Sequence, residues 1–199
     1  LGGSRLGGVL EIQGGSHVEI VAGLTLNAGD NVITRSSGSS IIRLNTIIRN
    51  AGATLSVSAN DIASTDTGNT NGIIGSWATV GLSDWATNSS LRDSGPVSTG
   101  LDGLIRAYTA YTPSSVTGDF VTNANMNIVG ATTQTNKTTN TLRFNTPGAG
   151  GGSMTVTLVG SNTIQSGGIL VTPGMGSSSA YISGTGTIIS GAGANSDLT

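Results

Sequence analysis

Short apolar pieces alternate with polar turns along most of the chain. Pieces such as Val18-Glu19-Ile20-Val21 and Leu24-Thr25-Leu26 place apolar side chains at every second position, which is the periodicity of a β-strand with one buried face. Turn residues such as Ala28-Gly29-Asp30-Asn31 separate them; these tolerate positive φ or hydrogen-bond their own backbone. Because helices would hold such glycines at a cost of about 1 kcal/mol each, the pattern predicts an all-β protein.

The apolar peaks recur at a fixed spacing near the start of the chain. Corresponding peaks are 21 or 22 residues apart, as in Ile12 and Ile33, Ile20 and Ile41, Leu26 and Ile48, and Ile33 and Leu55. Three strand-sized pieces fill each period. This arrangement predicts a right-handed parallel β-helix, or β-solenoid, of about 20–24 residues per rung.

The period divides the chain into three parts. Residues 1–60 follow it, residues 61–140 lose it, and residues 141–199 regain it through Leu142, Ile164 and Ile188. We therefore expect solenoid rungs in 1–60 and 141–199. Residues 61–140 are expected to form an insertion of short strands and loops on the flank of the solenoid.

The first and last predicted rungs have no evident cap. An uncapped rung exposes unpaired strand edges, which favour pairing with another chain. Since the sequence stops in mid-pattern, we expect a slice of a longer chain. Further rungs or a second copy, in a homo-oligomer or fibre, would then cover the edges.

Residues 71–87 contain both tryptophans. Trp77 and Trp85 each open a Trp-Ala-Thr tripeptide, and the offset of eight residues predicts a hairpin with both rings on one face. Together with Tyr108 and Tyr111 they form the candidate ligand-binding set, a platform on which sugars would stack. The competing interpretation is a small aromatic core for the insertion, which we favour because aromatic residues are only 4% of the chain.

Composition excludes several protein classes. With 9% charged residues and 32 glycines but few prolines, the chain fits neither charge-rich disorder nor collagen. The 8 basic residues are scattered, so we expect no nucleic-acid partner. No apolar run reaches the ~18 residues of a membrane-spanning helix, and the absence of cysteine removes disulfides and thiolate metal sites.

Candidate catalytic chemistry is sparse. His17 is the only histidine, so a Ser-His-Asp triad or a histidine metal centre has one imidazole available. The closest carboxylates, Asp61 and Asp66, lie in a polar stretch, whereas glycoside hydrolysis needs a facing pair. A calcium site at Asp30 lacks the repeated G-G-x-G-x-D pattern, which favours a plain turn. We therefore predict no enzyme activity, no metal site and no cofactor.

Several segments, in order, resemble bacterial autotransporter-associated β-strand repeat proteins, the large surface passengers of planctomycetes and verrucomicrobia. The matching segments are GLTLNAG at 23–29, IRNAGATL at 48–55, NGIIGSWATV at 71–80, DWAT at 84–87 and AYTAY at 107–111. The segment SNTIQSGGILV at 161–171 resembles the repeat unit, with departures at Gln165 and Ile169. The resemblance implies an exported β-helix at the outer surface or in the extracellular space, acting as a stalk, adhesin or fibre without catalytic residues.

Three functions remain open from the sequence. The first is a non-catalytic structural protein, a β-helical stalk or filament subunit. The second is an adhesin that binds surface glycans through the aromatic insertion. The third is a β-helix polysaccharide lyase or hydrolase, which the dispersed acids disfavour.

Overall fold

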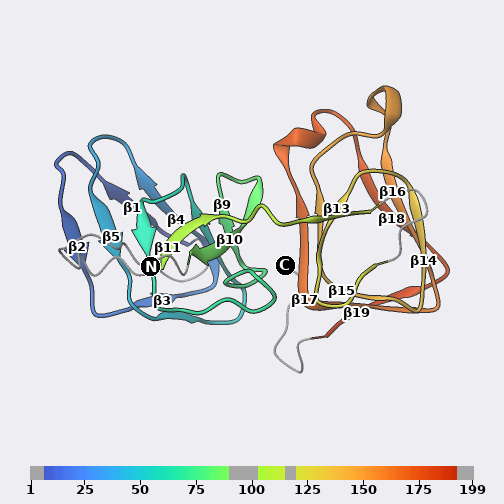
Figure 1. Cartoon of the computed structure of the whole chain (residues 1–199), viewed down its shortest axis with the longest axis horizontal. Coiled ribbons are helices and arrows are strands. Elements are labelled where there is room, and N and C mark those ends of the chain that lie inside the picture. Colours follow the sequence, from blue (N-terminus) through green and yellow to red (C-terminus); the bar gives the residue numbers. More distant parts are fainter. Residues whose placement is uncertain (1–6, 90–102, 115–119, 192–199) are drawn as a thin grey trace. The chain divides into compact units, whose positions relative to one another are not determined.

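A computed structural model describes residues 7–89, 103–114 and 120–191. The chain divides into two units, Leu1–Tyr108 (unit 1) and Thr109–Thr199 (unit 2), and almost all regular structure in both is β (Figure 1). The fold is a β-solenoid of about 7 turns, as the apolar pattern predicts. In the described residues, no helix has the length and apolar character needed to span a bilayer.

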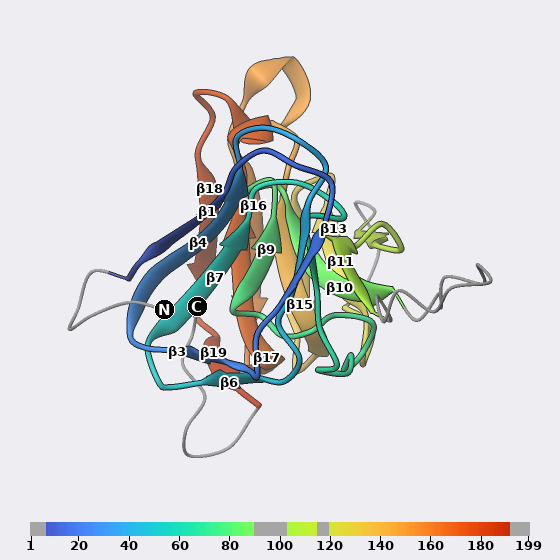
Figure 2. The ribbon, with the colours of Figure 1, turned by 90° about the vertical axis from the view of Figure 1, so that its left-hand side faces the viewer.

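Unit 1 is built from eleven strands in stacked rungs. The strands are β1 (Val9–Ile12), β2 (Val18–Ile20), β3 (Leu24–Leu26), β4 (Gly29–Arg35), β5 (Ile41–Arg43), β6 (Ile47–Arg49), β7 (Ala53–Val57), β8 (Ala63–Ser64), β9 (Ala78–Val80), β10 (Asp84–Ser89) and β11 (Leu104–Ala107). β1, β4, β7 and β9 lie side by side and parallel on one side of the solenoid (Figure 2). β2, β5 and β8 form the second side, and β3 and β6 the third.

The register of unit 1 confirms a rung length within the predicted 20–24 residues but corrects every predicted alignment. Three of the alignments are two residues too short, because Ile12 pairs with Arg35, Ile20 with Arg43 and Ile33 with Val57. Residues stacked on neighbouring rungs are typically 23 apart, as in His17 and Ser40. The predicted alignment of Leu26 with Ile48 is wrong by one residue, because Leu26 pairs with Arg49. A slip of one residue exchanges the two faces of a strand. Ile48 accordingly points outward and is 58% exposed, whereas Ile47 lies in the core.

The tryptophan hairpin closes one end of unit 1. β9 continues the first side of the solenoid, the three-residue loop 81–83 reverses the chain, and β10 pairs antiparallel with β9. β11 then pairs antiparallel with both β10 and β8. The first and second sides are thereby joined into one nine-stranded sheet. The prediction of a flanking insertion is wrong here, because Ala78 and Val80 of β9 lie in the solenoid core.

Unit 2 contains a second stack. Its elements are β12 (Thr112–Ser114), β13 (Asn125–Ile128), β14 (Thr132–Thr135), β15 (Thr138–Phe144), the 3-10 turn η1 (Ala149–Gly151), β16 (Met154–Val159), β17 (Ser161–Val171), the 3-10 turn η2 (Pro173–Met175), β18 (Ala180–Gly184) and β19 (Thr187–Ser190). β12, β13, β15, β17 and β19 form one parallel sheet, and β14, β16 and β18 another. β13 and β14 are therefore rungs, although they lie within the predicted insertion 61–140.

Aliphatic side chains fill the interior of each unit. Alternate strand residues point inward, such as Ile33 and Leu55 in unit 1 and Leu142 and Val156 in unit 2, and all four are buried. Rung length varies more in unit 2 than in unit 1: register partners are 16 residues apart at Asn125 and Thr141, 24 at Thr132 and Val156, and 26 at Met154 and Ala180. This less regular period explains why the apolar peaks of unit 2 are harder to align from the sequence.

Candidate functional site

The four aromatic residues singled out in the sequence do not form one platform in the described structure. Trp85 lies in β10 and is only 2% exposed, so its ring offers no face for a sugar. Trp77 precedes β9 in a turn and packs, partly buried, against the unit 1 core. Tyr108 lies close to Gly72 at the end of unit 1. Tyr111 belongs to unit 2, where its ring lies 4.3 Å from the guanidinium carbon of Arg143.

The only histidine takes part in a string of polar groups on the first rungs of unit 1. Nδ1 of His17 lies 3.0 Å from the hydroxyl of Ser40. Nε2 of His17 lies 3.0 Å from a carboxylate oxygen of Glu19. Serine, histidine and glutamate thus stand in the order of a catalytic triad. Glu19 lies in β2, His17 directly precedes β2, and Ser40 directly precedes β5.

The details of this string do not suit nucleophilic catalysis. A triad places Nε2 of the histidine at the serine and Nδ1 at the acid, whereas here the two nitrogens are exchanged. Ser40 is also 0% exposed, and its hydroxyl donates a hydrogen bond to the Gly14 carbonyl at 2.8 Å. With its proton engaged and no path to solvent, Ser40 has neither the access nor the base that an acyl transfer needs.

These polar side chains instead lie at the start of the unit 1 interior. Glu19 is the register partner of Ile42, whose side chain is buried, so position 19 lies on the inward side of its strand. A charged residue at an inward position of an edge strand blocks further strand pairing. His17 holds this carboxylate by the contact at Nε2 while it is itself anchored to Ser40. The three side chains therefore form a polar group at the first rung, in which His17 and Glu19 remain 47% and 65% exposed.

The first rung of unit 2 is closed by a different polar group. Gln134 points inward from β14 and is fully buried. Its side-chain oxygen accepts a hydrogen bond from the Phe120 backbone at 2.7 Å, and its amide donates to the Thr132 hydroxyl at 2.8 Å. A buried amide with its hydrogen bonds satisfied terminates an apolar interior without a large desolvation cost. Phe120 itself packs in the core, so the start of unit 2 is sealed.

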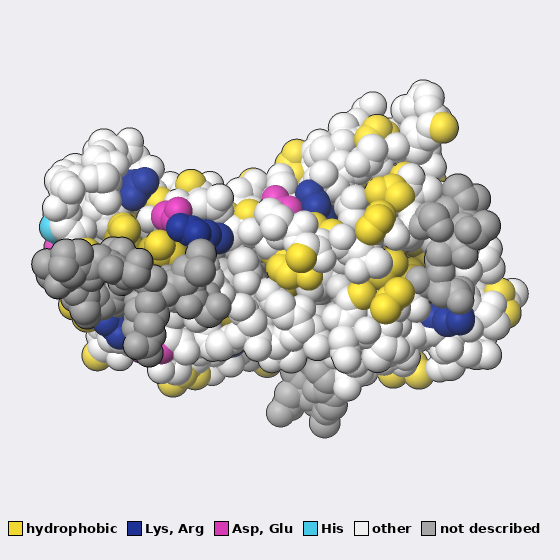
Figure 3. Space-filling view, in the orientation of Figure 1, with side chains coloured by type: hydrophobic (Ala, Val, Ile, Leu, Met, Phe, Trp, Pro, Cys, Tyr) yellow, Lys and Arg dark blue, Asp and Glu magenta, His cyan; other side chains and the backbone are white. Residues whose placement is uncertain are grey.

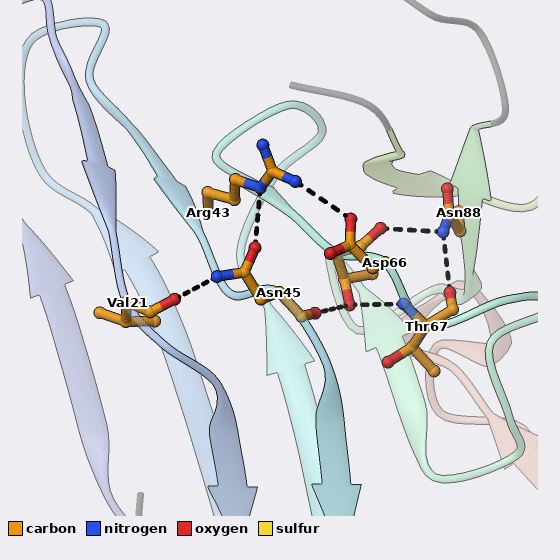
Figure 4. A network of polar contacts seen from close by, with 7 residues as sticks. Val21, Arg43, Asn45, Asp66, Thr67 and Asn88 are labelled. Carbon is orange, nitrogen blue, oxygen red and sulfur yellow. Dashed lines mark hydrogen bonds and ion pairs between the residues drawn. The ribbon is translucent and has the colours of Figure 1, made fainter. Parts of the chain in front are cut away.

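Polar side chains at one corner of unit 1 connect four successive rungs (Figure 4). Asn45 donates from its amide to the Val21 carbonyl on the rung before it. On the next rung, the Thr65 hydroxyl donates to the Asn45 carbonyl at 2.6 Å. On the last rung, Asn88 donates to the carbonyls of Thr65 and Thr67 at 3.0 and 2.7 Å. These side chains thus bind carbonyls of neighbouring segments, among them the Asn45 carbonyl, which also accepts the Asp66 backbone N–H at 3.1 Å.

Charged residues beside this corner are paired with each other. Arg43 donates to Asn45 at 2.8 Å and forms an ion pair with Asp66 at 3.4 Å. Arg106 of β11 donates to Asp61, and this hydrogen bond raises the pKa of the guanidinium. Asp61 and Asp66, the closest carboxylates in the sequence, are therefore each held by an arginine, which is not the facing, water-filled pair that glycoside hydrolysis uses.

The described residues contain no group of three or more histidine, cysteine or acidic side chains placed to hold a metal. Asp30 lies within β4 rather than in the expected turn, and its carboxylate accepts a bond from Thr54 at 3.3 Å. On the face drawn in Figure 3, basic and acidic side chains form only small separate groups. This surface offers no extended basic stripe of the kind that tracks a phosphate backbone.

Comparison of the chain with protein-family models, curated proteins and solved structures gave no match. The resemblance to autotransporter-associated repeat proteins thus stays a prediction.

Sequence reasoning missed the residues that organise the ends and corners. Asn45 carries a weak signal, since it follows a strand near the position expected for a corner, whereas Asn88 lies within β10 and carries none. His17 and Ser40 are one period apart, which with the corrected register of 23 places them on neighbouring rungs. Nothing in the sequence signals that Gln134 reaches the Phe120 backbone, because that contact depends on the path of the intervening chain.

Proposed function

We propose that this chain is a non-catalytic structural protein of the bacterial cell surface or extracellular space, in which each solenoid unit is a rigid segment of a stalk. The observation that supports the proposal most is that polar side chains form hydrogen bonds within the chain. At the corner of Figure 4 they bind neighbouring rungs of the same chain. Side chains committed to internal bonds stiffen a structure and leave few groups for chemistry on a substrate.

A stack of parallel rungs suits a load-bearing role. Each rung hydrogen-bonds to the rungs on either side along its strands, and aliphatic residues fill the interior behind them. Because neighbouring rungs share both the main-chain ladder and the core, bending the stack would break many contacts together. The surface or extracellular location rests on the family resemblance.

The ends of the units favour a stalk segment over a subunit of a head-to-tail filament. Such a filament needs two open, complementary ends. The start of unit 1 carries the inward carboxylate of Glu19, its far end is crossed by β10 and β11, and the start of unit 2 is sealed by Gln134.

The proposal is tested by immunogold labelling of the source cells with an antibody raised against the purified chain. We expect label on intact cells, on or beyond the outer surface. Label that requires lysis would overturn the proposal. As a parallel test, incubation with acidic and neutral polysaccharides should release no reducing ends, and turnover that depends on the chain would also overturn it.

A second candidate, glycan binding, is favoured by one outward sheet face of unit 2. The outward positions of β14, β16 and β18 carry hydroxyls that make no hydrogen bond to another described residue, namely those of Thr133, Thr135, Thr155, Thr157, Tyr181 and Ser183. Flat, uncharged hydroxyl arrays with an exposed aromatic ring suit a polysaccharide surface.

Sedimentation of the chain with insoluble chitin, cellulose or peptidoglycan tests this candidate. A variant with Tyr181→Ala and Thr157→Val should lose most of any binding while retaining the β-rich circular dichroism of the parent. Binding that survives both changes would exclude this face. Because Trp85 is buried, we do not place the glycan on the tryptophan hairpin.

A further inference from the structure

One outward face of unit 2 carries hydroxyl groups that are in register from rung to rung. Thr133 on β14 pairs with Thr157 on β16, and Thr157 pairs with Ser183 on β18. Thr133 and Thr157 alternate with buried residues such as Gln134 and Val156, so the side chains of this row point outward. The three residues form a row of hydroxyls that runs across the strands (the hydroxyl row).

The residues beside the hydroxyl row keep this face flat and uncharged. Thr135 pairs with Val159 on one side of the row, and Thr155 pairs with Tyr181 on the other. Threonine, serine and valine differ little in size, so the Tyr181 ring projects further than its neighbours, and it is 52% exposed. The strands β14, β16 and β18 contain no charged residue.

The charge and shape of this face indicate the chemical class of its ligand. An anionic polymer would need basic partners, which these strands lack. A protein partner would need a larger apolar area, because among the described residues of this face only Val159 and Tyr181 are large, exposed apolar groups. An uncharged sugar presents hydroxyls at its edges and a C–H face, which suit hydroxyl partners beside an aromatic ring. The face therefore suits a neutral polysaccharide.

The spacing of the hydroxyl row indicates the direction of the polymer. Neighbouring rungs lie ~4.8 Å apart, whereas alternate positions along one strand lie ~6.6 Å apart. The rung spacing is the closer of the two to the length of one pyranose ring in an extended β-1,4-linked chain. A polymer that runs across the strands therefore meets one hydroxyl of the row with each sugar.

We propose that this face binds an unsubstituted β-1,4-glucan of the cellulose type, which lies across the strands with one glucose unit on each of the rungs of β14, β16 and β18. The hydroxyl row exchanges hydrogen bonds with the edges of successive rings, and the Tyr181 ring contacts the glucose on the last rung. An unsubstituted ring fits best because a flat face gives an acetamido group no recess. The inference rests on the glycan-binding candidate of the proposed function and specifies its ligand.

Calorimetric titration of the purified chain with cello-oligosaccharides of two to six glucose units tests the length of the site. We expect the affinity to rise about fivefold from the dimer to the trimer and then to level off, because each rung adds one hydrogen bond. Salt should leave the affinity unchanged, because no charge takes part. An affinity that rises as steeply from four to six units would overturn the proposal, as would binding only to polygalacturonate that salt abolishes.

Single substitutions test the hydroxyl row itself. Thr157→Val removes the central hydroxyl and keeps the shape of the side chain, so the affinity for the trimer should fall at least about fivefold. The matched control is Thr163→Val, which changes the same residue type on the outward side of β17 in the other sheet of unit 2. It should leave the affinity within about twofold of the parent. Equal affinities of the two variants, with circular dichroism showing both folded, would overturn the proposal.

Two further substitutions test the direction of the polymer. Ser183→Ala removes the last hydroxyl of the row, so the trimer should bind no better than the dimer. Thr155→Val lies on the same strand as Thr157 but outside the row, and it should leave the affinity for the trimer within about twofold of the parent. A loss at Thr155 with none at Ser183 would mean that the polymer runs along the strand, which would overturn the proposal.

Failure of this inference is distinct from failure of the proposed function. If the chain sediments with chitin or peptidoglycan but binds no cello-oligosaccharide, the glycan-binding candidate stands and the inference is wrong. The cell-surface labelling depends on neither result.

Discussion

Replacing Asn45 removes the central residue of the corner network in unit 1. The backbone at Asn45 has φ of 51°, a left-handed conformation that asparagine tolerates better than alanine. Its side chain donates to the Val21 carbonyl and accepts from Arg43. Asn45→Ala therefore deletes two hydrogen bonds between or beside rungs and introduces backbone strain at one position.

The expected loss can be estimated term by term. A neutral hydrogen bond contributes about 1 kcal/mol net. The bond from Arg43 is charge-assisted but partly exposed, with a side-chain exposure of 25%, so we discount it to about 1 kcal/mol. Alanine in the left-handed region adds about 1 kcal/mol. The free energy of unfolding of unit 1 should fall by about 3 kcal/mol, a large part of the 5–15 kcal/mol typical of domains.

Two matched variants separate these contributions. Asn45→Asp keeps the tolerated backbone conformation and the acceptor for Arg43 but loses the donor to Val21, so we expect a loss of about 1 kcal/mol. Ile48→Ala changes an outward, exposed side chain on the same rung and should stay within about 0.5 kcal/mol of the parent.

Tryptophan emission during urea unfolding is the suitable assay. Both tryptophans, Trp77 and Trp85, lie in unit 1, so their emission follows that unit, while far-UV circular dichroism follows both. If Asn45→Ala unfolds at the same urea concentration as Ile48→Ala, the corner network contributes nothing and the argument for a stiff stack is refuted. If Asn45→Asp loses as much stability as Asn45→Ala, neither the bond from Arg43 nor the left-handed backbone at position 45 contributes measurably.

Three further predictions follow from single sites. Ile105 is fully buried on the closing strand β11, so Ile105→Ala should lower the free energy of unfolding of unit 1 by about 2–5 kcal/mol. A decrease below about 1 kcal/mol in the tryptophan assay would contradict the place of Ile105 in the core. With Trp77→Phe, the remaining Trp85 should emit at shorter wavelength and resist acrylamide quenching more than Trp77 does in Trp85→Phe; equal quenching would contradict the burial of Trp85. The hydrogen bond from Ser36 lowers the pKa of Glu11, so its stabilising effect is present above the ordinary glutamate pKa and is lost as the pH falls through the lowered value. Ser36→Ala should therefore raise the pKa of Glu11 in an NMR titration, and an unchanged titration would show that the bond is not formed in solution.

The fold could be predicted because its signals are local. Alternation in segments such as residues 24–26, and turn residues between them, report strand and corner within a few positions. The rung length follows from repetition of that pattern. The phase of the repeat did not follow, because Ile47 and Ile48 are both apolar and only packing decides which one faces the core.

The candidate site was less accessible to sequence reasoning. The aromatic residues stood out by their rarity, yet Trp85 serves the end of a solenoid, and Tyr111 belongs to another unit. The polar group of His17, Glu19 and Ser40 consists of ordinary residue types, and these residues meet only if the register of neighbouring rungs is correct to one residue. A residue's rarity in the sequence is thus a poor guide to its exposure in the fold.

The sequence by itself determined that this chain forms β-rungs with an aliphatic interior and few charged groups, because each strand carries its own alternation and each corner its own turn chemistry. Only the tertiary structure decided how the stack is divided and terminated. The closing strands β10 and β11 pair antiparallel with strands before them in the chain, and Gln134 binds the Phe120 backbone across a rung. These contacts join distant residues whose side chains have no preference for one another until the backbone brings them together, so no local pattern encodes how the stack is divided and terminated.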